Sequence, residues 1–418
     1  MSARSRLPAK GTSWPELESR MQDMAGGDVK WRDGKLGVYI FHAGEDVLDV
    51  AHEAYGMFIS ENGLGPLAFP SIAEMEKQVI ENGLTLLNAP DDGCGSFTSG
   101  GSESIMLAVK TARDTAKAQG LVKAGEGEIV VPYTAHPAFD KAAHALELKI
   151  IRVPVSMPIG AADVAAMEDA ITDRTIMMVG SAPNFPYGVV DPIPTLSDLA
   201  LRKDVWLHVD ACVGGYFAPF AKRLGVNIPD FDFTNAGVRS ISADLHKYGY
   251  AAKGASTVFH RDKAQGDIQS FTFDDWPGGH MYTPNMAGTR PGGAIAAAWA
   301  VQQYLGEEGY LKTTQAALNA RMIVENGLKE MPGFNLIGDS KLALIAYAHE
   351  THSAGKLMGG LMQRGWFHAG VSDPKGLHLM LSPEHEKTMP HYLADLKEIT
   401  AALDAGAKAD DKTVQYGG

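Results

Sequence analysis

The middle of the chain alternates between short apolar, β-branched runs and segments of helical periodicity, which limits the possible folds more than any other feature. The expected strands are residues 128–132, 149–155, 175–180, 205–210, 238–243 and 255–260. The helices expected among them are residues 103–119, 138–146, 161–171 and 193–203. Such alternation is typical of a mostly parallel sheet covered by helices on both faces. We therefore predict an α/β protein whose ligands bind beyond the carboxyl ends of its strands.

The pattern changes after about Gly309, which indicates a second, smaller α/β domain. The elements expected there are helices at 310–331, 353–364 and 390–403 and strands at 342–348 and 376–381. Another helix is expected near the start of the chain, at residues 46–59. We therefore divide the chain into an N-terminal arm and helix (1–62), a large domain (63–309), a small C-terminal domain (310–404) and a flexible tail (405–418).

Charge and composition exclude several classes of function. The net charge of −13 disfavours nucleic acid as a partner, although a local pocket can still bind a small anion. No apolar segment approaches the roughly 18 residues of a membrane span, and residues 1–15 lack the apolar core of a secretory signal. With only two cysteines, a cytoplasmic location is expected. The histidines show no metal-ligand spacing, so no metal site is expected.

Two polar residues come at or just after the ends of expected strands. Lys247 can form an imine with an aldehyde if burial lowers its pKa, or it is a solvated surface lysine. Asp210 is costly to bury without a cationic partner such as a protonated pyridine nitrogen, unless it caps a helix or lies in a surface loop. His208, on the same strand face, either hydrogen-bonds that acid or is a core histidine. Cys212 is expected to pack in the core.

A glycine- and serine-rich run precedes the first of the expected helices, and a histidine follows the next strand. The run extends from Ser96 to Ser104. Backbone amides at a helix N-terminus, together with hydroxyl groups, can bind a phosphate monoester, but an ordinary capped helix also explains the run. His136 can stack on a flat ring or cap the helix that follows it. Together, a phosphate cup, a stacking ring, an acid and a lysine are what pyridoxal 5′-phosphate requires.

At these residues the chain resembles pyridoxal-phosphate enzymes of the aspartate-aminotransferase fold, also called fold type I. Within that fold it is similar to the sphingosine-phosphate lyase branch, which neighbours the group II amino-acid decarboxylases. The similar stretches span roughly residues 35–400, and Ser240–Lys253 is the most specific to the branch. The resemblance implies a large, mostly parallel sheet domain that binds the cofactor and a smaller C-terminal α/β domain.

The resemblance also implies a role for each matching residue. Lys247 would bind the cofactor covalently, Asp210 would pair with its ring nitrogen and His136 would stack on its ring. The other cofactor-binding residues would be Gly100, Gly101, Ser102, Asn184, Ser242, His246 and Thr289. Thr289 would come from the second subunit of a homodimer with shared active sites. The residues near the substrate would be Tyr39, Lys253 and Arg290.

The activity that the resemblance implies is an aldehyde-lyase reaction of sphingolipid metabolism. A lipid phosphate, a sphingoid base of the sphingosine 1-phosphate type, would be cleaved by retro-aldol chemistry to a fatty aldehyde and phosphoethanolamine. Asn62–Gly65 lacks the histidine that family members often carry there, which is associated with the substrate phosphate. Decarboxylation of an amino acid stays open, because Lys253 and Arg290 can hold a phosphate or a carboxylate. A binding protein without activity is a second alternative, which the presence of Lys247 disfavours.

Overall fold

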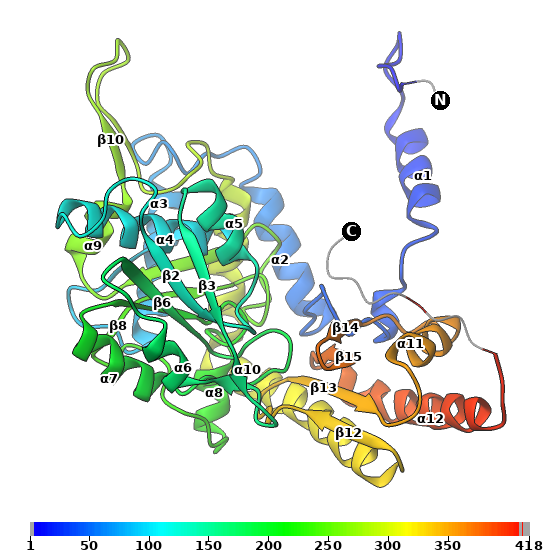
Figure 1. Cartoon of the computed structure of the whole chain (residues 1–418). Helices are drawn as coiled ribbons and strands as arrows, with labels where there is room; N and C mark the ends of the chain where they lie inside the picture. Colours follow the sequence, from blue (N-terminus) through cyan, green and yellow to red (C-terminus); the bar gives the residue numbers. More distant parts are fainter. Residues whose placement is uncertain (1–3, 409–411, 413–418) are drawn as a thin grey trace.

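A computed structural model describes residues 4–408 and 412, and a seven-stranded sheet forms its centre (Figure 1). The strand order is β1 (Cys94–Thr98), β9 (Ser256–His260), β8 (Val238–Ala243), β7 (Trp206–Asp210), β6 (Thr175–Ser181), β2 (Glu128–Pro132) and β3 (Lys149–Val153). Neighbours from β8 to β3 pair in parallel, whereas β9 is antiparallel to both of its neighbours. The predicted mostly parallel α/β fold is confirmed.

Helices cover both faces of this sheet. Every residue of β2 is buried, and its side chains alternate between two apolar cores. Ile129 and Val131 pack with α4 (Gly101–Ala118) and α5 (Ala138–Ala145). Val130 faces the other core, to which α7 (Ile193–Lys203) contributes. Burial on both faces explains why these strands are continuous apolar runs.

The C-terminal part forms a second, antiparallel sheet, at the lower right of Figure 1. Its order is β12 (Phe334–Ile337), β13 (Leu344–His349), β15 (Lys375–Met380) and β14 (Ala369–Ser372), with helices α11 (Ala354–Gln363) and α12 (His385–Asp404). The long helix α10 (Gly292–Glu330) connects the two sheets and has a kink at Gly306 (φ 54°, ψ −172°). The expected domain boundary at 309/310 falls inside α10, and the division into domains stays a prediction.

Several elements differ from those expected. Helix α2 (Glu45–Met57) lies close to the predicted bounds, but α1 (Trp14–Ala25) and α3 (Pro70–Leu86) were not predicted. Helix α1 stands away from the body of the molecule and has no buried residue (Figure 1). A hairpin of β10 (Phe271–Phe273) and β11 (Met281–Thr283) also projects outward. The shorter elements are η1 (Trp31–Asp33), β4 (Val155–Ser156), β5 (Ala161–Ala162), α6 (Val164–Asp169), α8 (Ala218–Arg223) and α9 (Lys263–Gln269).

The structure describes only part of the predicted C-terminal tail. Of the expected flexible tail at 405–418, residues 409–411 and 413–418 lie outside the described residues.

Within residues 4–408 and 412, no helix combines the length and apolar character needed to cross a bilayer. The same residues contain no group of three or more His, Cys, Asp or Glu side chains arranged to hold a metal ion.

Candidate active site

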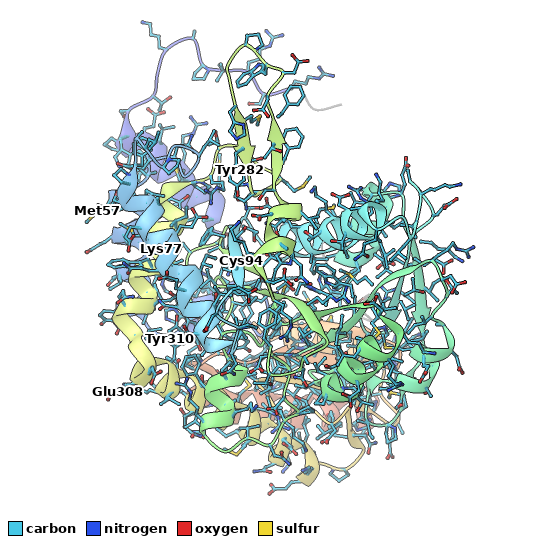
Figure 2. All side chains as sticks on the ribbon, turned by 90° about the vertical axis from the view of Figure 1, so that its left-hand side faces the viewer. Met57, Lys77, Cys94, Tyr282, Glu308 and Tyr310 are labelled. Carbon is cyan, nitrogen blue, oxygen red and sulfur yellow. The ribbon has the colours of Figure 1, made fainter. Side chains whose placement is uncertain are left out.

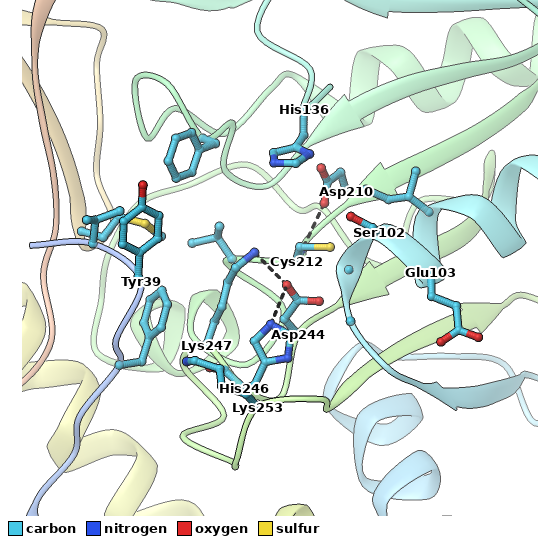
Figure 3. Close-up of a pocket in the computed structure, with 18 of the residues that line it drawn as sticks. Tyr39, Ser102, Glu103, His136, Asp210, Cys212, Asp244, His246, Lys247 and Lys253 are labelled. Atoms are coloured by element: carbon cyan, nitrogen blue, oxygen red, sulfur yellow. Dashed lines mark hydrogen bonds and ion pairs between the residues drawn. The ribbon is translucent and has the colours of Figure 1, made fainter. Parts of the chain in front are cut away.

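A cavity of about 450 Å³ lies where β2, β7 and β8 end, facing the start of α4 and the end of β15. This volume is typical of a small-molecule site. The predicted site residues that line it are Tyr39, Gly100, Gly101, Ser102, His136, Asp210, His246, Lys247 and Lys253. Figure 3 shows most of them pointing into a common space. The structure therefore brings together nine of the thirteen residues predicted from the sequence.

Lys247 lies in the turn after β8 and forms an ion pair with a residue to which the sequence analysis assigned no role. Its Nζ is 2.7 Å from Oδ2 of Asp244, a carboxylate that is 2% exposed. Burial of Lys247 disfavours its charged form, but attraction to Asp244 and the other acidic groups around it together outweigh that effect and raise the pKa of Lys247. Burial likewise opposes ionisation of Asp244, yet Lys247 and His246 lower the pKa of Asp244 overall. The expectation that burial would lower the pKa of the lysine and free its lone pair was therefore wrong for this state.

Asp244 is held by contacts on several sides. Ser256 Oγ donates a hydrogen bond to its Oδ1 (2.5 Å), and His246 Nε2 lies 3.7 Å from its Oδ2. Asp244 and Lys247 are three residues apart, and the turn after β8 folds one side chain onto the other. This spacing of three residues was the only feature of the sequence that could have indicated the ion pair. It can be interpreted only when the conformation of the turn is known.

Asp210, the last residue of β7, is fixed by hydrogen bonds to one carboxylate oxygen. Its Oδ1 accepts the Cys212 N–H (3.1 Å) and the Ser242 O–H (3.3 Å). Ser242 is fully buried opposite Asp210 in the sheet and does not line the cavity, so its side chain supports this acid and not the expected phosphate. His208 reaches Ser242, with Nε2 3.2 Å from Oγ, so its expected bond to Asp210 is indirect. Cys212 is buried as expected, but it also lines the cavity.

The start of α4 forms a concave wall of backbone. Gly100, Gly101 and Ser102 line the cavity at the helix N-terminus, where the first N–H groups have no intrahelical partner. A Cβ atom on Gly101 would lie 2.9 Å from both Asp244 carboxylate oxygens and from the Cys212 sulfur. Only glycine therefore allows the helix to approach the turn that carries Lys247.

His136 makes a helix-capping contact and also lies where it could stack on a ligand, as considered from the sequence. Its Nδ1 accepts the backbone N–H of Ala138 (3.1 Å) at the start of α5, so it caps that helix. Its ring also faces the cavity, next to Asp210 (Figure 3). Burial lowers the pKa of His136, which favours a neutral ring suited to stacking on a flat ligand.

Four predicted residues lie away from this cavity. Asn184 is buried, and its Nδ2 donates to the Gly160 carbonyl (3.0 Å). Arg290 pairs with Glu76, and its Nη2 donates to the Gly63 carbonyl (2.7 Å). Thr289 is exposed, and the fourth residue is Ser242. Within this chain, none of the four side chains is placed to contact a ligand in the cavity.

Comparison with known proteins identifies the family. Residues 4–350 match the pyridoxal-dependent decarboxylase conserved domain. The chain belongs to the pyridoxal-dependent decarboxylase family. Sphingosine-1-phosphate lyase 1 of Rattus norvegicus is 36% identical, an alignment covering 96% of this chain and 71% of that protein. A probable L-aspartate decarboxylase of Pyrococcus abyssi is 33% identical, with 94% of this chain and 99% of that protein covered.

Solved structures agree with this assignment. The structure of a sphingosine-1-phosphate lyase of Burkholderia pseudomallei superimposes with a TM-score of 0.91 at 33% identity, covering 96% of this chain and 93% of that chain. The predicted fold type I architecture and the resemblance to the lyase branch are thus confirmed. The cofactor of this pyridoxal-dependent decarboxylase homologue is pyridoxal 5′-phosphate, as predicted.

The residues of this family member fit that cofactor. The amine of Lys247 faces the cavity on one side, and the carboxylate of Asp210 and the ring of His136 lie on another (Figure 3). The start of α4 lines the cavity at Gly100, Gly101 and Ser102, and the free N–H groups of a helix N-terminus favour a phosphate. This set of donors matches the three needs of the cofactor: an amine for its aldehyde, an acid for its ring nitrogen and amides for its phosphate.

Lys253 is a second lysine that lines the cavity. Its Nζ donates to the His246 carbonyl (3.1 Å) and lies 5.5 Å from the centre of the Phe41 ring. Loss of water around the amine and the charge of Lys247 lower the pKa of Lys253 to about 8. The lysine whose pKa is lowered is therefore Lys253 and not Lys247.

Proposed function

We propose that this chain cleaves a phosphorylated sphingoid base of the sphingosine 1-phosphate type into a fatty aldehyde and phosphoethanolamine. The observation that carries this proposal is similarity to sphingosine-1-phosphate lyases over 96% of the chain, in sequence and in structure. The cavity supports it, because it collects an amine, an acid, a stacking ring and a phosphate cup in one place.

The residues of the chain have distinct tasks in this reaction. Bound pyridoxal phosphate supplies an electron sink for the carbanion left when a carbon–carbon bond breaks. Lys247 binds the cofactor, and Asp210 holds a proton on the ring nitrogen so that the ring stays electron-poor. His136 stacks against the ring and keeps it flat against the cavity wall. Asp244 would hold Lys247 in its ammonium form whenever that amine is not bound to the cofactor, as the 2.7 Å contact between the two side chains shows for the free lysine.

Lys253 and Tyr39 would meet the substrate at the entrance. Both line the cavity, and the partly protonated amine of Lys253 can attract the phosphate of the substrate. The group that removes the proton from the 3-hydroxyl of the substrate would also lie on this side. Where the phosphate is anchored would help to decide which bond of the substrate is broken, and for this reaction it is the bond between carbons 2 and 3.

We further propose a homodimer in which Thr289 and Arg290 reach the site of the second subunit. Large apolar side chains are exposed on the β10–β11 hairpin, among them Phe271, Trp276 and Tyr282. Figure 2 shows this hairpin rising above the body of the molecule. A second copy would cover this surface, as expected for a symmetric dimer.

A mixing experiment tests the shared sites. Lys247→Ala and Thr289→Asp homodimers should each be inactive. If the sites are shared, a heterodimer of the two variants contains one intact site, so random mixing restores about a quarter of the wild-type sites. No recovery in a mixture that demonstrably forms heterodimers would contradict the sharing of Thr289.

Decarboxylation of an amino acid is the second candidate. The family description and the Pyrococcus abyssi relative favour it, as does the missing histidine at Gly65. Purified holoenzyme should be given a phosphorylated sphingoid base and, separately, L-aspartate and L-glutamate. The lyase proposal requires release of phosphoethanolamine and fatty aldehyde. If an amino acid instead releases carbon dioxide and the sphingoid base releases no phosphoethanolamine, the chain is a decarboxylase and the lyase proposal is wrong.

A cytoplasmic location is also proposed, and it depends on the cysteines. Both Cys94 and Cys212 are free thiols, and they form no disulfide with each other. Free thiols are usual in a reducing compartment. Fractionation of the producing cells would test the location directly.

A further inference from the structure

A row of buried polar side chains lies behind Asp210, on the side away from the cavity. Trp206, His208 and Asp210 are every second residue of β7, so their side chains point to the same face of the sheet. Ser240 and Ser242 lie beside them on β8. Trp206 Nε1 is 2.8 Å from Ser240 Oγ, which is 2.8 Å from His208 Nδ1. His208 Nε2 is 3.2 Å from Ser242 Oγ, which is 3.3 Å from Asp210 Oδ1. The four residues behind Asp210 are at most 2% exposed, and we call them the relay.

The chemistry of the two ends sets the direction of these hydrogen bonds. The indole N–H of Trp206 can only donate, so Ser240 Oγ accepts from it and has its own hydrogen left for His208 Nδ1. Burial lowers the pKa of His208 to about 4, so its ring is neutral at pH 7 and carries one hydrogen. With Nδ1 accepting, that hydrogen is on Nε2 and points to Ser242.

The opposite tautomer leaves two groups unsatisfied. If Nδ1 carried the hydrogen, Ser240 would accept twice, and its own hydrogen would have no acceptor among the hydrogen bonds of residues 4–408 and 412. The hydroxyl of Ser242 would then have to choose between His208 Nε2 and Asp210, leaving one acceptor without a hydrogen. Unsatisfied polar groups in a buried site are costly. The hydrogen count therefore favours donation from Trp206 through to Asp210.

We propose that the relay positions Asp210 for the cofactor by delivering a one-way series of hydrogen bonds to its Oδ1. Ser242 is the last member, and it acts together with the Cys212 N–H, which donates to the same oxygen. Both of these donors therefore reach the same carboxylate oxygen, Oδ1, and so fix the orientation of the carboxylate at the cavity. The members of the relay are positioning residues, since none of their side chains lines the cavity.

This inference rests on the proposed pairing of Asp210 with the cofactor, but its first test does not. In holoenzyme labelled with ¹⁵N-histidine, the resonances of His208 are assigned by their loss in His208→Gln. The expected spectrum is that of a neutral ring with hydrogen on Nε2, and a hydrogen on Nδ1 would overturn the direction of the relay. Trp206→Phe should populate both tautomers, because Ser240 is then free to turn; an unchanged spectrum would show that Trp206 does not set the direction.

The second test asks whether the relay affects the cofactor. Ser242→Ala should weaken binding of pyridoxal phosphate about threefold to tenfold, since Asp210 loses the hydrogen bond from the Ser242 hydroxyl. Ser181→Ala is the matched control: Ser181 is buried on β6, in register with Asp210, and its hydroxyl has no hydrogen-bond partner among the described residues. Equal cofactor affinity in the two variants would refute the positioning role. Neither readout depends on which substrate is cleaved, so a failure of the lyase proposal would leave both results interpretable.

Discussion

The floor of the cavity and its rim differ in how their polar groups are satisfied. The floor, formed by Asp210, Asp244 and Lys247, has its acids buried and joined to neighbours by short contacts. The rim, formed by Tyr39 and Lys253, is exposed, and Tyr39 is 46% exposed. A single chain therefore builds the side that would hold the cofactor. The side that would meet the substrate is left open, which is where a second subunit and the substrate itself would complete it.

Removing the amine of Lys247 from the floor should abolish the activity of the protein. Lys247→Ala is expected to lower kcat by about 10³-fold or more and to abolish the absorbance of covalently bound cofactor. Lys247→Arg keeps the positive charge beside Asp244 but cannot form the bond to the cofactor, so it should be inactive and still folded. Activity in either variant would remove Lys247 from its assigned role.

The ion pair of the floor should also contribute strongly to stability. Asp244→Asn leaves Lys247 without its partner, and the free energy of unfolding of the cofactor-free protein should fall by about 3 kcal/mol. The pKa of Asp244 is lowered in the folded protein, so its contribution is present above the ordinary value of 3.8 and lost as pH falls through the lowered value. Denaturant titrations of both proteins should therefore converge only in strong acid, and equal stability at pH 7 would contradict the pairing.

The rim should respond to pH where the floor does not. With a pKa of about 8, Lys253 loses most of its charge between pH 7 and pH 9, so the KM for a phosphorylated substrate should rise about tenfold over that range. Lys253→Arg keeps its charge and should remove this dependence. A KM that rises equally in both proteins would mean that another group binds the phosphate.

Breaking a contact on the exposed β10–β11 hairpin should have the smallest effect on stability and activity, in contrast to breaking the buried pair of the floor. His280 Nδ1 lies 2.6 Å from Asp274 Oδ1, as short as the contact between Asp244 and Lys247, but both side chains are more than half exposed. Asp274→Asn should leave the unfolding midpoint and kcat unchanged, since water screens such pairs. A loss comparable to that of Asp244→Asn would show that burial does not explain why the pair in the floor matters more than the pair on the hairpin.

Much of the large domain was predictable because periodicity follows burial. The predicted bounds of α7 and β8 are those observed, and both elements bury apolar side chains at regular spacing. The positions of Asp210, His136 and Lys247 were also predictable, since each lies at or just beyond the end of a strand and such ends meet at one edge of the sheet.

Side-chain partners were less predictable than positions. Ser242 and Asn184 were expected at the cofactor, but packing turns Ser242 toward Asp210 and Asn184 toward the Gly160 carbonyl. Asp244 was missed because an acid near a lysine is common in any sequence, and only the turn after β8 brings the two together. Helix α1 was missed because it buries nothing within this chain. The partners of Ser242 and Asn184, by contrast, lie 24 or more residues away in the sequence, where a local pattern cannot reveal them.

The kink at Gly306 sets the direction of the second half of helix α10. Glu330 lies 24 residues beyond Gly306, so the distal arm is about 36 Å long, and a change of about 5° at the kink moves its end by about 3 Å. That end packs against β12 and β13, and β15 beside them carries Met380 to the cavity wall. The backbone angles of Gly306 belong to a region that other residues rarely adopt. We therefore expect replacement of this glycine to change the angle of α10 and, through the second sheet, the position of Met380 at the cavity, although Gly306 itself does not line the cavity.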